Sequence, residues 1–185
     1  QLIEMVGPEL GLLDQEIARL ALTTEPGGKI TAAAVKKSVG SWRAKTTWNM
    51  LDTALEGKAR DAMIQLDRLL LAGENPIAIL AQISATLRRF AAATRLVLQA
   101  EQAGRRIGLR ATLEQAGFKP FVLKKAEQQL RQLGRQRGQQ LYGWLLEADL
   151  ALKGNSLVEP RLILERLILR LATGGKKPDR SKAAG

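Results

Sequence analysis

Leucine and alanine recur at intervals of three and four residues along most of this chain, and this spacing is the feature that most limits its fold. The longest example runs through Ile79, Ile83 and Leu87, which places these side chains on one face of a helix. No segment alternates β-branched or aromatic residues with polar ones as a half-buried strand does, and aromatic residues make up only 4% of the chain. The pattern predicts an all-α fold.

Glycine and proline divide this pattern into helical segments. Thr31 is a predicted N-cap, and Asn75 followed by Pro76 is a typical N-cap and first-turn pair. Gly57 and Gly73 are predicted to end helices in the left-handed conformation. The expected helices cover residues 9–23, 32–39, 47–55, 58–72, 76–103, 109–116, 120–134, 136–154 and 160–171. Short connections between such segments are typical of a packed helical bundle.

The same spacing predicts which side chains face the core. In the first helix they are Leu10, Leu13, Ile17, Leu20 and Ala21, and in the helix over 58–72 they are Ala59, Met63, Leu66, Leu70 and Leu71. Trp42, Trp48 and Trp144 are predicted core anchors, because aromatic side chains bury large areas. Asp149 and Lys153 form an i,i+4 pair of structural importance only.

Two residue types are absent, and their absence excludes whole classes of chemistry. The chain has no cysteine and no histidine, which rules out thiolate nucleophiles, zinc–thiolate sites and Ser-His-Asp or Cys-His catalysis on this chain. Carboxylate or lysine catalysis stays open, but no motif supports it. Gly27-Gly28-Lys29 lacks the earlier glycine and the following Ser or Thr of a phosphate loop, so a plain turn is expected. We expect no catalytic activity, no cofactor and no metal site.

The net charge of +11 indicates polyanionic partners, meaning nucleic acid or acidic protein surfaces. Six basic residues between Arg88 and Arg110 are interrupted only by Glu101, and six between Lys119 and Arg137 only by Glu127. The candidate nucleic-acid contacts are Arg88, Arg89, Arg95, Arg105, Arg106, Lys124 and Lys125. Alternatively, both runs are solvated helix faces whose aliphatic stems cover the core, because neither run has interleaved aromatics for base stacking.

Several stretches in fixed order resemble the delta subunit of the bacterial DNA polymerase III clamp loader. Residues 6–22 and 30–35 resemble the end of its lid domain. Residues 51–57, 59–71 and 73–76 resemble the start of its collar domain, and residues 148–154 and 162–171 resemble the collar's end. The sequence departs from the family at Lys58, where an acid is frequent, and at Ala32–Ala34, which replace acidic residues.

The resemblance implies a domain organisation and a set of partners. Residues 1–41 would be the end of an AAA+-type lid domain, residues 46–173 a helical collar that assembles five loader subunits into a ring, and residues 174–185 a disordered basic tail. The subunit itself would not hydrolyse ATP. The contact with the sliding clamp would belong to a preceding AAA+ domain that this sequence lacks.

A second hypothesis comes from a different class of protein. The chain could instead be a free-standing basic helical module that binds DNA or RNA directly. A large exposed apolar surface would favour the collar, because a self-sufficient binder has no need of one. Neither a signal peptide nor an apolar run of about 20 residues is present, so we expect a soluble, cytoplasmic protein without membrane contact.

Overall fold

The computed structural model describes residues 10–25 and 27–173, without the side chains of residues 12, 36–42 and 44. Within these residues every regular element is helical and there is no strand, which confirms the all-α prediction. The elements in chain order are α2 (Leu10–Leu22), α3 (Ala32–Leu55), α4 (Ala59–Leu71), α5 (Pro76–Gln102), α6 (Leu109–Gln115), the 3₁₀ turn η1 (Pro120–Val122), α7 (Leu123–Leu150), the π-helical turn η2 (Ala151–Asn155) and α8 (Pro160–Ala172). The predicted tail lies outside the described residues.

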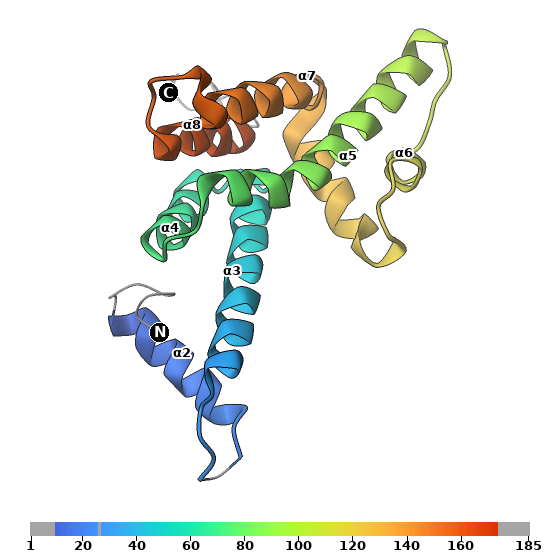
Figure 1. Cartoon of the computed structure of the whole chain (residues 1–185). Coiled ribbons are helices and arrows are strands. Elements are labelled where there is room, and N and C mark those ends of the chain that lie inside the picture. The colour runs from blue at the N-terminus through green and yellow to red at the C-terminus, as the bar shows by residue number, and fades with distance from the viewer. Residues whose placement is uncertain (1–9, 26, 174–185) are drawn as a thin grey trace, which may run out of the picture.

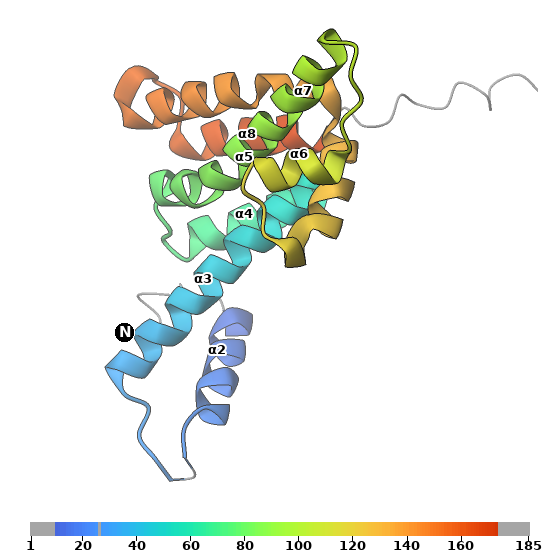
Figure 2. The ribbon, with the colours of Figure 1, turned by 90° about the vertical axis from the view of Figure 1, so that its right-hand side faces the viewer.

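The helices form a bundle from which one hairpin projects (Figures 1 and 2). The second half of α3 packs against α4, and α8 packs against α3, α4 and α7. The second half of α5, α6 and the first half of α7 extend the bundle on one side. On another side α2 and the first half of α3 project as the hairpin. None of the described helices could span a bilayer.

Several predicted helix ends are confirmed, each with the expected cap. The Thr31 hydroxyl accepts a hydrogen bond from the Ala34 amide at 3.2 Å, and the Asn75 side chain accepts one from the Ile77 amide at 2.8 Å. These bonds satisfy amides that have no partner within the helix. At Gly57 the backbone turns to φ +80°, a conformation that glycine adopts without steric cost. Local sequence therefore sets these boundaries.

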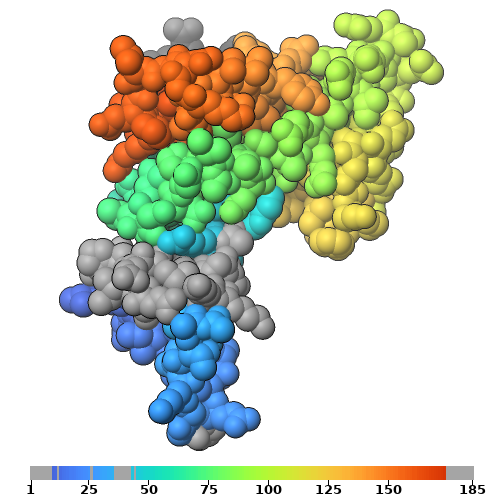
Figure 3. All heavy atoms as spheres, viewed as in Figure 1, coloured from blue at the N-terminus to red at the C-terminus, as the bar shows by residue number. Residues whose placement is uncertain are grey.

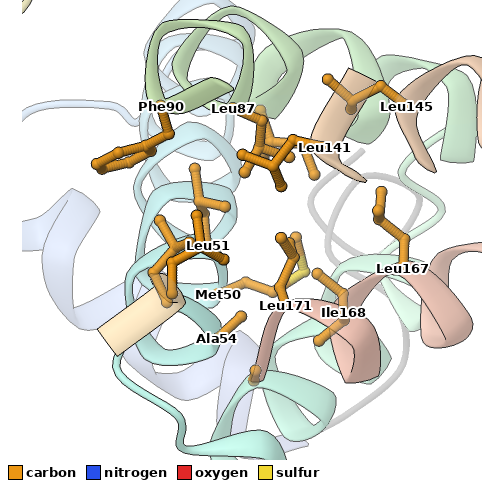
Figure 4. Close-up of a cluster of buried hydrophobic side chains, with 14 of the residues drawn as sticks. Met50, Leu51, Ala54, Leu87, Phe90, Leu141, Leu145, Leu167, Ile168 and Leu171 are labelled. Carbon is orange, nitrogen blue, oxygen red and sulfur yellow. The ribbon is translucent and has the colours of Figure 1, made fainter. Parts of the chain in front are cut away.

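The core lies where α3, α5, α7 and α8 meet (Figure 4). Phe90 is completely buried and packs against Phe118 at a ring-centroid distance of 4.8 Å. Other buried side chains drawn in Figure 4 include Met50, Leu51, Ala54, Leu87, Leu141, Leu145, Leu167, Ile168 and Leu171. The predicted apolar stripe of α5 through Ile79, Ile83 and Leu87 is confirmed, and these side chains are buried together with Phe90 and Ala91.

Two glycines shape α7. At Gly134 the backbone is non-helical, with φ 72° and ψ 169°. The predicted break between two helical segments is therefore present inside this element. One turn later, Gly138 lies so close to Thr94 of α5 that a Cβ atom built there would collide with the threonine side chain. The missing side chain thus allows α5 and α7 to cross in close contact.

The prediction of two separate helices over 32–39 and 47–55 is wrong. A single helix, α3, runs without interruption through Gly40 and Ser41. A glycine inside a helix costs only about 1 kcal/mol relative to alanine. Packing of the second half of α3 on α4 and the core outweighs a cost of this size. The domain boundary proposed at these residues stays a prediction, and it would fall within a continuous helix.

Four predicted core positions are also wrong. Leu10, Ile17 and Ala21 of α2 are exposed, because in the described residues α2 packs mainly on α3 and only part of its apolar face is covered. Leu71 of α4 is 64% exposed, since α4 buries Ala62, Leu66 and Leu69 instead. The sequence did not identify the buried face of α4, because Ala59 and Leu71 fit the three- and four-residue spacing as well as the residues that are buried.

The tryptophans do not behave alike. Trp48 is 42% exposed and is not a core anchor, because it lies at the edge of the face of α3 that carries Met50, Leu51 and Ala54 into the core. Trp144 is partly buried and packs against the core, as predicted. The side chain of Trp42 lies outside the described residues. The Asp149–Lys153 ion pair is confirmed at 2.8 Å on an exposed surface.

Candidate assembly surface and nucleic-acid groove

A hollow of about 330 Å³ lies where α3, α5 and α7 meet beside η1. Its floor is apolar, because Leu51, Phe118, Val122 and Ala126 line it. Its rim carries two aromatic and three basic side chains, and we call it the aromatic–basic groove. The rim residues are Trp48, Arg89, Lys119, Phe121 and Lys125.

The two aromatic rings of this groove are unusually exposed. Phe121 is 86% exposed and Trp48 is 42% exposed. Large apolar rings that stay in water at one place are typical of binding surfaces rather than of structure. The basic runs have no interleaved aromatics in sequence, but the fold supplies them from α3 and η1. Exposed rings beside cations can stack on bases while the cations neutralise phosphates.

An ion-pair network holds one wall of the groove. Asp52 of α3 accepts hydrogen bonds from Lys125 at 2.5 Å and from Gln129 at 2.8 Å, both on α7. The Lys125 charge is therefore largely compensated. Arg89 and Lys119 form no ion pair with any described residue, so their charges face the groove uncompensated.

The structure brings together only two of the seven candidate nucleic-acid contacts. Arg89 and Lys125 share the groove, whereas Arg95 lies over the ring of Tyr142, 5.7 Å from its centroid, beside a different hollow. The remaining four are exposed but do not line the groove, and they are Arg88, Arg105, Arg106 and Lys124. Sequence reasoning missed Trp48 and Phe121 as candidate site residues, and it placed Lys119 in the second basic run without selecting it as a candidate contact.

The second basic run includes Arg137. The interpretation of that run as an exposed, phosphate-binding or solvated surface is wrong for this residue. Its side chain is 8% exposed and donates hydrogen bonds to the carbonyl oxygens of Leu133 (2.8 Å), Leu171 (2.6 Å) and Gln132. Leu133 precedes the break in α7, and Leu171 lies in the last turn of α8. These carbonyls form the negative ends of two helical segments, which favour a cation. Burial lowers the pKa of Arg137.

A second exposed surface is apolar and lies on α4 and α8. Ile64 and Leu71 are seven residues apart on one face of α4, and Leu162 and Leu169 have the same spacing on α8. All four side chains are exposed. Arg161 of α8 forms an ion pair at 2.5 Å with Asp67, which lies between Ile64 and Leu71 on α4.

We call these four side chains the α4–α8 face. Figure 3 shows the C-terminal part of the chain in direct contact with the segment that contains α4 and α5. Apolar stripes on two adjacent helices, both left in water, are typical of a protein–protein interface.

The fold and these surfaces define a class of protein: an all-helical domain, in the part that the structure describes, with an exposed apolar face and a groove lined by aromatic and basic side chains. The particular family follows from a comparison with protein-family models. The family "DNA polymerase III delta subunit, C-terminal domain" matches residues 44–171, and the chain belongs to this family. No curated protein and no solved structure matched the chain.

Membership confirms the resemblance stated from the sequence and gives the chain a role in the clamp loader of DNA polymerase III. The delta subunit is a non-catalytic component of the polymerase III holoenzyme, and its C-terminal domain interacts with other clamp-loader subunits. The match begins at residue 44 in the second half of α3 and ends in the last turn of α8. It therefore includes both the aromatic–basic groove and the α4–α8 face.

Proposed function

We propose that residues 46–173 are a collar that assembles this chain with the other clamp-loader subunits into the ring that places the sliding clamp on primed DNA. The α4–α8 face carries this proposal, because its four exposed apolar side chains would leave water on association. Residues 1–41 would be the end of a lid domain. The sliding clamp would be contacted only by a domain outside this chain.

The alternative, a stand-alone nucleic-acid-binding module, accounts for the charge but not for the α4–α8 face. Such a module gains nothing from leaving leucines in water on two neighbouring helices, whereas an assembly domain needs them. The collar is therefore the better account of the molecule. Contact with DNA becomes a second property of the same domain.

Co-purification tests the collar. The 185-residue chain is expected to associate with the ATP-binding subunit of the clamp loader and to show no association with the sliding clamp, with both measured side by side. Apolar association should persist at about 0.5 M salt, because salt screens charges but does not weaken apolar burial. A chain that binds neither loader subunits nor the clamp would contradict the collar, and tight clamp binding would contradict the division of roles between domains.

We further propose that the aromatic–basic groove contacts single-stranded DNA without sequence preference. Phe121→Ala should weaken binding by about tenfold, since stacking of a base on an aromatic ring contributes about 1–3 kcal/mol. Arg89→Glu should weaken it and reduce its salt dependence, because fewer counterions are then released on binding. Fluorescence anisotropy with a labelled oligonucleotide at several salt concentrations measures both effects.

Arg95→Glu is the matched control for the groove, because it makes the same charge change on the same helix outside the groove. Equal losses for Arg89→Glu and Arg95→Glu would indicate a general charge effect rather than a defined groove. Binding that does not depend on salt, or that depends on sequence, would contradict contact through phosphates and stacking.

A further inference from the structure

Another hollow of about 330 Å³ lies between the C-terminal half of α7 and α8. It exists because small residues face α8 at this point. Ala148 and Ala151 are three residues apart and line the hollow together with Ile163 and Leu167. The larger side chains of Trp144, Glu147 and Leu150 line the hollow around these small ones.

The rim of this hollow combines an apolar edge with a net positive charge. Leu150 lines the hollow and is exposed. Glu147 and Arg170 are bound to each other, because the Arg170 guanidinium donates to both carboxylate oxygens, at 2.5 and 3.1 Å. This bond holds the pKa of Glu147 below its usual range. Arg170 also lies over the ring of Trp144, 5.9 Å from its centroid, so its position is fixed from two sides.

Arg166 differs from its neighbours on this rim. It is exposed and lines the hollow, and its charge also helps to lower the pKa of Glu147, although the hydrogen bonds to that carboxylate come from Arg170. The rim therefore carries two guanidiniums against one carboxylate.

We infer that this hollow is a socket for a helix of a neighbouring clamp-loader subunit, which inserts one large apolar side chain between α7 and α8 and places a carboxylate on Arg166. The inference rests on the proposed collar function and names the chemistry of the partner's contact. Apolar anchors that fill a preformed pocket beside a charge pair are the usual centres of binding energy in interfaces. The excess of positive charge at the mouth, two guanidiniums against one carboxylate, selects an acidic partner, since a basic one would be repelled.

Two single substitutions in the 185-residue chain test the two parts of the socket. Arg166→Glu should weaken association with the loader subunits by about tenfold at low salt, and the loss should shrink as salt rises. Leu150→Gln should weaken association by about tenfold at every salt concentration, because it removes apolar contact rather than charge. The measurement is the dissociation constant with each purified loader subunit, by calorimetry or interferometry.

Arg131→Glu is the control, because it makes the same charge change at an exposed position on α7 before the break at Gly134. It should leave association unchanged, and the thermal melts of all variants should match the wild type. The socket is overturned if Arg166→Glu and Leu150→Gln associate normally while substitutions on the α4–α8 face prevent association, an outcome that leaves the collar intact. It is also overturned if Arg166→Glu weakens DNA binding instead. A wild-type chain that binds no loader subunit would contradict the collar itself.

Discussion

The double substitution Leu162→Glu with Leu169→Gln is expected to reduce association with the other clamp-loader subunits by about a thousandfold, or about 4 kcal/mol. Each leucine is exposed on the α4–α8 face and would lose about 1.5–3 kcal/mol of burial on association. Glutamate at Leu162 lies in the first turn of α8, where a negative charge is favourable. Glutamine at Leu169 avoids a negative charge in the last turn, so the helix itself should stay intact.

Leu10→Glu with Ile17→Gln is the matched control for this experiment. Both residues are exposed apolar side chains on a helix, and both lie outside the family match. The control should associate as the wild type does, with thermal melts recorded for every variant. If both double variants lose association equally, general surface polarity would explain the loss. If neither does, the α4–α8 face is not the interface.

Arg137→Met is expected to lower the free energy of unfolding by about 3 kcal/mol. Methionine preserves much of the side-chain volume but leaves the carbonyl oxygens of Gln132, Leu133 and Leu171 without their donor. Each hydrogen bond from a charged donor contributes about 1.5–3 kcal/mol. Part of this loss is offset, because the variant no longer has to remove a charged guanidinium from water when it folds. Urea denaturation measures the loss directly, and the melting temperature should fall by about 6–12 °C.

Two further variants isolate the cause. Arg137→Lys keeps the charge but replaces a planar fork by a single ammonium, which cannot reach the end of the first α7 segment and the end of α8 together. It should therefore recover only part of the loss. Arg131→Met, at an exposed position on the same helix, should change stability by no more than about 0.5 kcal/mol. If Arg137→Met is as stable as the wild type, the guanidinium does not tie α8 to the break in α7.

The sequence alone determined most of the local structure, because the interactions that set it are close together along the chain. The cap of α3 needs only Thr31 and the amide of Ala34. The start of α5 needs only Asn75 and Pro76, and Gly57 ends α3 because glycine adopts positive φ without strain. The family could also be predicted from the sequence, because the resemblance rests on stretches in a fixed order along the chain and requires no knowledge of their contacts.

Positions that depend on distant neighbours could only be decided by the tertiary structure. Arg137 has the same charge as Arg131, yet only the packing of α8 against α7 buries one and leaves the other in water. Likewise, Trp48 and Phe121 are far apart in the sequence and meet only because α3, α5 and η1 converge. Helical spacing shows which residues share a face, but several faces of α2 and α4 are equally apolar. Contacts with other helices select one of them, and the faces left over become the surfaces available for assembly.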